Sequence, residues 1–180
     1  MTENIRSQMI EFLPRLRRFA YALTRNWEQA DDLVQDTCER ALARADQWQP
    51  GTRLDSWMYR IAQNIWFDSR RAAKTRGERA DLEDIGEVSG SDGRAIVESR
   101  LTLASVFKEM DRLPRDQQVL VALVCIDGLS YKEAAETLQL PIGTVMSRLS
   151  RARQAIAAGL MDSNPALAAA TSGARLGKTS

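Results

Sequence analysis

The chain has 180 residues, with 25 basic and 24 acidic side chains, a formal net charge of +1 and no histidine. This length suits one ordinary domain or two small ones. No apolar run approaches the ~20 residues of a membrane-spanning helix. The amino-terminal MTENIRSQM also lacks the layout of a signal peptide. We therefore expect a cytoplasmic protein without a membrane span.

The missing histidine argues against an enzyme or a zinc site, because histidine is the commonest general acid–base and a frequent metal ligand. The sequence also has no Gly-rich phosphate loop, no G-x-S-x-G and no H-E-x-x-H. Cys38 and Cys125 lie far apart in apolar helical contexts, which predicts two buried free thiols. We expect no catalytic residue, no metal and no cofactor.

Apolar residues recur at helical spacing along the chain, which predicts an all-α fold. In the first half, a helix is expected to begin near Pro14, since proline is tolerated in a first turn. Asn26 is expected to cap a second helix at about 28–45. The inner side of this helix is expected to carry Ala30, Leu33, Thr37 and Ala41. A break at Pro50 and Gly51 precedes a third expected helix at about 54–71.

The second half begins after RGERADLEDIGEVSGSDGRA, from Arg76 to Ala95, which is acidic and rich in glycine and serine. This composition predicts a flexible linker. Further helices are expected at about 97–112, 115–126, 130–138 and 142–158. The tail beyond Leu160 is low in complexity and is expected to be disordered. The predicted organisation is two small helical domains, 1–75 and 97–160, with a linker at 76–96 and a tail at 161–180.

Charge is distributed unevenly along this layout. Acidic residues occur without any basic one between Asn26 and Glu39, whereas bases predominate between Gly51 and Arg79. A third segment, from Ile142 to Ala158, has arginines and no acid. Two basic surfaces separated by acidic sequence indicate two contacts with a polyanion.

The segment LSYKEAAETLQLPIGTVMSRLSRARQAI, residues 129–156, predicts a helix-turn-helix. Ser130 and Glu133 fit a capping box at the start of the first helix, and the second helix opens near Pro141. Its outer face is expected to carry Thr144, Ser147, Arg148 and Arg151, which suit the bases and phosphates of a DNA major groove. The alternative is a plain helical hairpin with a solvated basic face, but the absence of acids favours DNA. Gln139 stands where many such turns have glycine.

The expected third helix carries a second basic stripe. Arg60, Asn64, Phe67 and Arg71 fall on one side of it, an arrangement that suits single-stranded nucleic acid. The preceding loop, Trp48 to Ser56, is a candidate pocket for a flipped base. Alternatively, Trp57 and Phe67 pack in the core, which we favour for Trp57. The acidic face around Asp31–Asp36 suits a basic protein partner or is simply solvated.

Three segments together resemble a known family: DDLVQDTCERAL (31–42), SWMYRIAQNIWFDSRR (56–71) and the helix-turn-helix segment. They are similar to the extracytoplasmic-function (ECF) group of sigma-70 family RNA polymerase sigma factors. Two shorter segments, QPGTRLDSWM and TVMSRLSRAR, are similar to the general stress-response branch of this group. Met146 departs from the family at a position that is often basic.

This resemblance implies a transcription initiation factor that binds the clamp helices and the flap of core RNA polymerase. Such a factor directs the polymerase to promoter DNA and helps to melt the DNA. It also implies control by an anti-sigma factor and a stress regulon. The residues implied at the −35 element are Thr144, Ser147, Arg148 and Arg151. Those implied at the −10 element are Gly51, Thr52, Arg53, Arg60, Asn64 and Arg71. Those implied at the polymerase clamp are Asp31, Asp32, Leu33, Gln35 and Asp36.

Two other functions remain open on sequence grounds. A stand-alone helix-turn-helix regulator would bind DNA without polymerase. A sigma-like decoy would sequester an anti-sigma factor without promoting transcription, but it would not need the two basic surfaces.

Overall fold

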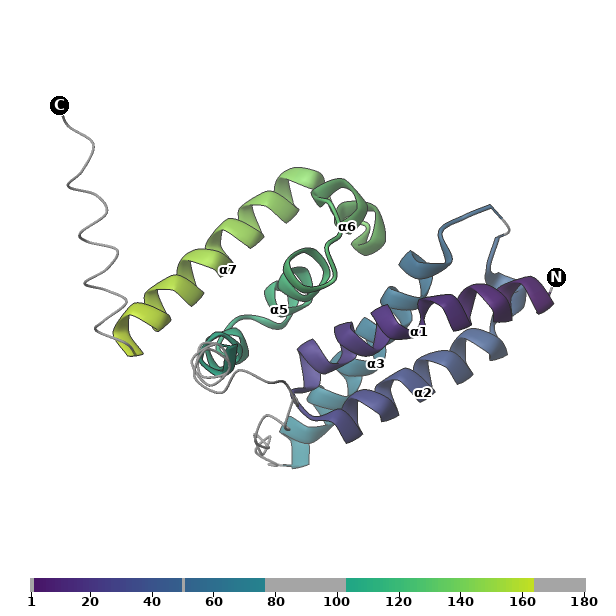
Figure 1. The fold of residues 1–180 in the computed structure, drawn as a ribbon, viewed down its shortest axis with the longest axis horizontal. Helices are drawn as coiled ribbons and strands as arrows, with labels where there is room; N and C mark the ends of the chain where they lie inside the picture. Colours follow the sequence, from purple (N-terminus) through teal and green to yellow (C-terminus); the bar gives the residue numbers. More distant parts are fainter. Residues whose placement is uncertain (1, 50, 77–102, 164–180) are drawn as a thin grey trace, which may run out of the picture.

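A computed structural model describes residues 2–49, 51–76 and 103–163 (Figure 1). Throughout these ranges the chain forms helices and turns and no strand, which confirms the predicted all-α class. None of the described helices is long and apolar enough to span a membrane. The predicted linker and tail lie outside the described residues, except for their first positions. Arg76 ends a helix, and residues 161–163 continue one.

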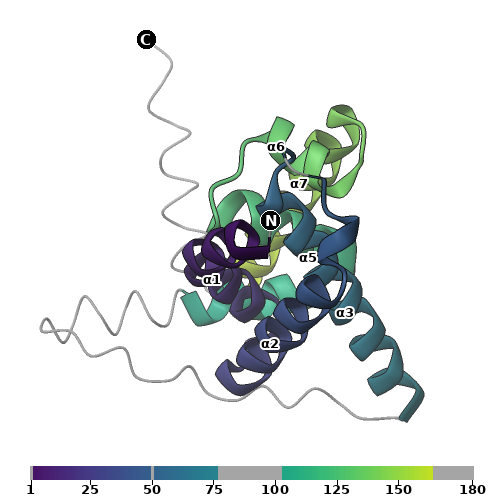
Figure 2. The ribbon, with the colours of Figure 1, turned by 90° about the vertical axis from the view of Figure 1, so that its right-hand side faces the viewer.

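The first half consists of α1 (Thr2–Thr24), α2 (Trp27–Ala43), a 3-10 turn (Ala45–Gln47) and α3 (Leu54–Arg76). The second half begins with helical residues 103–111, followed by α5 (Arg115–Val121) and a π-helical turn (Ala122–Ile126). It ends with α6 (Tyr131–Leu138) and α7 (Ile142–Ser163). Figures 1 and 2 show α1, α2 and α3 packed together, with the second half lying against them.

The core of the first half is built around Tyr59 of α3. Its ring is fully buried, and the rings of Phe12 and Phe19 on α1 both meet it edge-on, with centroids 4.9 Å away. Edge-to-face contacts of this kind stabilise a core beyond the area they bury. Tyr59 therefore joins α1 to α3, which is the helix that carries the second basic stripe.

The start of α1 differs from the prediction. Pro14 lies inside α1 rather than in its first turn, so the helix extends twelve residues further towards the amino terminus. The apolar residues Ile5, Met9 and Phe12 are buried on the same side as Leu16. Packing of this long apolar side compensates for the one backbone hydrogen bond that proline cannot donate.

The start of α2 confirms the prediction. The Asn26 side chain accepts a hydrogen bond from the Gln29 amide at 2.8 Å, which satisfies a backbone donor that the helix itself leaves unpaired. The inner side of α2 is buried as expected. Its buried residues are Ala30, Leu33, Thr37 and Ala41. The opposite side of α2 is therefore left for solvent or a partner.

The helix-turn-helix is also present. Ser130 and Glu133 form both hydrogen bonds of the capping box. Val145, Leu149 and Ala152 of α7 are buried in the core of the second half. The helix expected at 115–126 is not regular, because α5 gives way to the π-helical turn at Ala122. This wider turn ends at Asp127 and sets the direction in which that residue points.

Both cysteines are free, as predicted, but their predicted burial is wrong. Cys125 is exposed and Cys38 is half-buried. Cys125 lies on the outer side of the π-helical turn, whereas Ala122 and Leu123 of the same turn face the core. Burial raises the pKa of the Cys38 thiol, which keeps it protonated at neutral pH.

Replacing Gln139 with glycine is expected to stabilise the protein by about 0.5–1 kcal/mol. Gln139 ends α6 in the left-handed conformation with φ 54°, which is strained for a residue with a Cβ atom. Chemical unfolding followed by circular dichroism measures the change. The control Gln139→Ala keeps the Cβ atom and should give no comparable gain, so equal stabilisation by both substitutions would contradict this explanation.

Candidate nucleic-acid interface

The outer face of α7 presents the predicted helix-turn-helix residues. Ser147 and Arg151 are exposed, and Thr144 is half-buried. The Ser147 hydroxyl donates to the Thr144 carbonyl at 3.1 Å. Arg148 is held by an ion pair with Asp116 of α5 at 2.9 Å, so its guanidinium is already partly neutralised. Of the two predicted arginines, Arg151 is therefore the more available to DNA.

Two apolar side chains flank this polar face on the first turns of α7. Ile142 and Met146 are 50% and 52% exposed. Met146 stands at a position that is often basic in the family that the sequence resembles. An exposed methionine there cannot pair with phosphate, but it offers an apolar surface to a base edge.

A hollow of about 420 Å³ lies between the loop before α3, the start of that helix and Glu136 of α6. It brings together three of the predicted −10 residues, Thr52, Arg53 and Arg60. Trp48 and Trp57 also line it, and both pack against the core. The fourth residue, Gly51, has a φ of +90° and is exposed in the adjoining turn. The predicted loop therefore does form a concave, partly basic site.

The other two predicted −10 residues do not line this hollow. Asn64 is exposed further along α3, and Arg71 is exposed eleven residues beyond Arg60, about 16 Å along the helix axis. Arg71 pairs with Asp68 at 3.4 Å and borders a separate hollow beside α5. The stripe read from the sequence is therefore continuous on α3 but divided between two concavities.

The exposed face of α2 carries most of the predicted polymerase-binding residues. Asp32, Gln35 and Asp36 are exposed. Asp31 is also exposed, and it accepts a hydrogen bond from Arg17 of α1 at 2.6 Å. The fifth residue, Leu33, is only 6% exposed because it lies on the apolar side of α2 and packs in the core.

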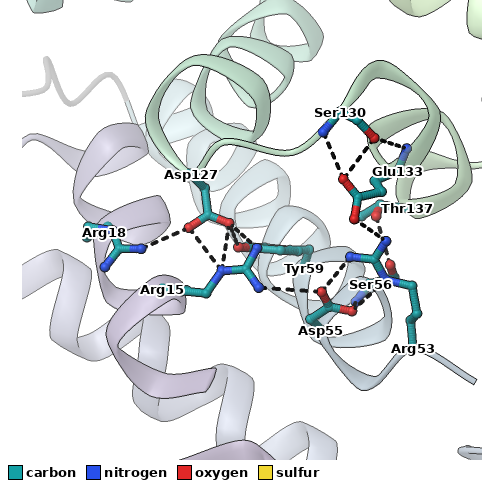
Figure 3. A network of polar contacts seen from close by, with 10 residues as sticks. All are labelled: Arg15, Arg18, Arg53, Asp55, Ser56, Tyr59, Asp127, Ser130, Glu133 and Thr137. Carbon is teal, nitrogen blue, oxygen red and sulfur yellow. Dashed lines mark hydrogen bonds and ion pairs between the residues drawn. The ribbon is translucent and has the colours of Figure 1, made fainter. Parts of the chain in front are cut away.

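The two halves of the chain meet at a polar seam, drawn in Figure 3. At one point of the seam, which we call the Asp127 cluster, the Asp127 carboxylate receives hydrogen bonds from α1 and α3. Arg15 donates at 2.8 Å and Arg18 at 3.3 Å, and the Tyr59 hydroxyl also donates to it. The Asp127 side chain is fully buried by these partners. A buried carboxylate needs such donors, because its desolvation is otherwise strongly unfavourable.

At a second point of the seam, α6 lies over the start of α3. Arg53 donates to Asp55 at 2.7 Å and to Glu133 at 2.9 Å. The hydroxyls of Ser56 and Thr137 share a hydrogen bond of 2.8 Å. Glu133 thus serves two structures at once, since its other carboxylate oxygen completes the capping box of α6.

The charges of the seam support one another. Hydrogen bonding to Asp127 is the largest effect on Arg15 and raises the pKa of its guanidinium. Burial and the neighbouring Asp127 carboxylate raise the pKa of the Tyr59 hydroxyl well above its ordinary value, which keeps it protonated as a donor. Burial acts to raise the pKa of the Asp55 carboxyl, but hydrogen bonds from Arg53 and the Ser56 amide lower it overall. Asp55 therefore stays ionised opposite two arginines.

Sequence reasoning found the surfaces but missed the seam. The sequence pattern predicts Glu133 only as a capping residue and predicts no role for Asp127. Their partners lie 68 or more positions away in the sequence, beyond the reach of helical periodicity. The signal in the sequence is Asp127 itself, an acid that directly follows an apolar run.

Together, the fold and these surfaces define a protein of two contacting helical modules, one of which presents a helix-turn-helix with a basic face. Each module matches a family model from known proteins. Residues 9–63 match the family model of the sigma2 domain of PhyR. Residues 103–156 match the model of sigma-70 region 4.

Individual relatives cover most of the chain. It is 34% identical to the ECF RNA polymerase sigma factor EcfG of Rhodopseudomonas palustris, over 88% of this chain and 86% of that one. It is 38% identical to the ECF RNA polymerase sigma factor SigE of Mycolicibacterium smegmatis, over 78% of this chain and 55% of that longer one. A solved structure of the sigma factor RpoE from Bartonella quintana in complex with the anti-sigma factor NepR is similar, with a TM-score of 0.68 and 30% identity. That match covers 88% of this chain and 97% of the other. The chain therefore belongs to the ECF family of RNA polymerase sigma factors.

Proposed function

We propose that this protein acts in the cytoplasm as an initiation factor that binds core RNA polymerase and directs it to a set of promoters. It does so by binding rather than by catalysing a reaction. The residues assigned from the sequence supply three contacts: α7 for the −35 element, the loop and α3 for the −10 element, and α2 for the polymerase clamp.

The observation that carries this proposal is the outer face of α7. Its exposed Ser147 and Arg151, with Thr144 beside them, present hydroxyl and guanidinium groups on the second helix of a helix-turn-helix. Such a helix fits the DNA major groove, where arginine can bind guanine through two hydrogen bonds. Arg148 reaches DNA on this proposal only by exchanging Asp116 for a phosphate or a base.

At the −10 element, the proposed action is capture of an unpaired base by the loop and α3, which form one wall of the 420 Å³ hollow. Arg53 and Arg60 lie at its wall and are placed to bind the phosphates on either side of such a base. Unstacking a base from duplex DNA costs a few kcal/mol, which these contacts would offset. Arg71 and Asn64 would follow the strand further along α3.

The exposed acids of α2 are proposed to meet the basic surface of the polymerase clamp, with Asp32, Gln35 and Asp36 as the contacts. The module proposed at 97–160 would also meet the polymerase flap. The proposed module boundaries are those given from the sequence: 1–75 and 97–160, with a linker at 76–96 and a tail at 161–180.

Control by an anti-sigma factor is part of the proposal. The similar RpoE chain was solved with NepR. A second similar structure, CnrH with the cytosolic domain of CnrY, has a TM-score of 0.66 and 25% identity over 91% of each chain. The genes transcribed with this factor are proposed to form a stress regulon, given the relatedness to EcfG.

Reconstituted transcription tests this function. Purified chain and core polymerase are incubated with a library of promoter fragments, and the transcripts are sequenced. We expect transcripts that start downstream of a shared pair of upstream motifs, and none with core polymerase alone. A chain that shifts DNA by itself at physiological salt but yields no transcripts would instead be a stand-alone regulator. One that binds only an anti-sigma factor would be a decoy.

A further inference from the structure

The seam between the two halves covers part of the surface assigned above to the −10 element. Arg53 is bound by Glu133 of α6 at 2.9 Å, and Glu136 of the same helix lines the hollow beside Arg60. Carboxylate and phosphate oxygens bind the arginine fork in the same way. Asp55 of α3 holds Nε and Nη2 of Arg53, so Glu133 occupies Nη1, the nitrogen that Asp55 leaves for a DNA phosphate.

We propose that the isolated chain closes on itself, with α6 bound over the −10 surface, and that this closed form must open before promoter DNA is captured. The inference rests on the proposed function, because α6 blocks DNA only if the surface beneath it is one that binds DNA. The occupant of the surface is thus the chain's own helix-turn-helix module.

The Asp127 cluster makes this contact specific. Every hydrogen-bond partner that the described residues give to the Asp127 carboxylate belongs to α1 or α3. The second half alone therefore supplies no donor for this side chain, which is fully buried in the closed form. In the closed form the donors from α1 and α3 replace the water that this carboxylate loses, so Asp127 can be buried only in this arrangement of the two halves.

Other parts of the seam make the closed form displaceable. The side chains of Arg53 and Glu133 are 37% and 40% exposed, and exposed pairs of this kind contribute little and are screened by salt. Near the end of α1, Arg25 is buried over the ring of Phe107, and its Nε lies 3.5 Å from Asp111. None of its guanidinium nitrogens has a hydrogen-bond partner among the described residues. Burial lowers the pKa of Arg25 to about 10. Opening the seam would let water reach this group, which offsets the loss of contacts elsewhere.

A reversible cross-link tests the proposal. The Ser56 and Thr137 hydroxyl oxygens are 2.8 Å apart, which brings these side chains close enough for a disulfide to be designed between them. The variant carries Ser56→Cys and Thr137→Cys, with Cys38→Ser and Cys125→Ser to remove the native thiols. We expect mild oxidation to cross-link the folded, isolated chain. The cross-linked chain should then support at least about tenfold less promoter-directed transcription with core polymerase.

The same variant after reduction is the matched control, because it contains identical substitutions, and its transcription should recover. Equal transcription by the oxidised and reduced forms would overturn the closed-form proposal while leaving the proposed function intact. Failure of the folded cysteine variant to cross-link at these positions would overturn it as well. If both the reduced variant and the unmodified chain fail to transcribe, the proposed function is wrong and the inference falls with it.

A second pair of variants tests which contacts hold the closed form. Glu133→Gln keeps a capping box, since glutamine serves that role, but removes the charge opposite Arg53. Asp127→Asn removes the negative charge that Arg15 and Arg18 bind in the Asp127 cluster. Both should slow cross-linking, Asp127→Asn by about tenfold or more. The control Asp68→Asn breaks only the exposed pair with Arg71 within α3 and should leave the rate unchanged. Cross-linking of all three at one rate would contradict the assignment of these contacts.

Discussion

Replacing Tyr59 with alanine is expected to lower the free energy of unfolding by about 3–5 kcal/mol. The ring is completely buried, and both Phe12 and Phe19 pack against it edge-on. Removing it leaves a cavity between α1 and α3 and deprives the buried Asp127 carboxylate of one donor. Guanidinium unfolding followed by circular dichroism measures the loss.

Tyr59→Phe separates the two contributions of this residue. It retains the ring and removes only the hydroxyl, so the expected loss is smaller, about 1.5–3 kcal/mol for a hydrogen bond to a charged group. An equally large loss in both variants would show that packing of the ring is not the main contribution. No loss in Tyr59→Phe would show that the hydrogen bond to Asp127 does not stabilise the protein.

Replacing Arg151 with alanine is expected to weaken promoter binding by the sigma–polymerase complex by about 1–3 kcal/mol, roughly 5- to 150-fold. Arg151 is exposed on the outer face of α7, and within the described residues no ion pair occupies it. Arg148, by contrast, must first leave Asp116. Arg151 is therefore expected to be the stronger base-reading residue of the two.

Fluorescence anisotropy with promoter fragments substituted at single −35 positions measures this effect. A base-reading arginine should lose discrimination at one position, whereas a phosphate contact should weaken binding to all fragments alike. Arg153→Ala is the matched control, because it removes the same charge two residues along α7. Its side chain points elsewhere and donates to the Tyr131 hydroxyl at 2.9 Å. Equal losses in the two variants would mean that only total charge matters.

Local patterns in the sequence were sufficient to predict most of the helices. Asn26 and the buried side of α2 follow from capping chemistry and from spacing within a single helix. The capping box of α6 was predictable for the same reason. Leu33 was assigned to the clamp together with its whole segment, and its side chain lies on the buried side of α2.

Contacts between distant segments could not be predicted in this way. The π-helical turn interrupts an apolar pattern that reads as a continuous helix from Arg115 to Ile126. Pro14 shows the opposite case, in which tertiary packing continues a helix through a residue that usually marks an end. The seam depends on how the two modules face each other, and one sequence without contact information does not specify that orientation.

The π-helical turn also makes closure depend on chain length. The Asp127 amide bonds to the Ala122 carbonyl at 3.0 Å, five residues back instead of the four of an α-helix. Each residue of an α-helix rotates the side-chain direction by about 100°. Deleting one residue from the Ala122–Ile126 turn would therefore swing the carboxylate about a quarter of a circle away from α1. Such a shortened chain would keep every charged group of the network in its sequence and yet lose the network.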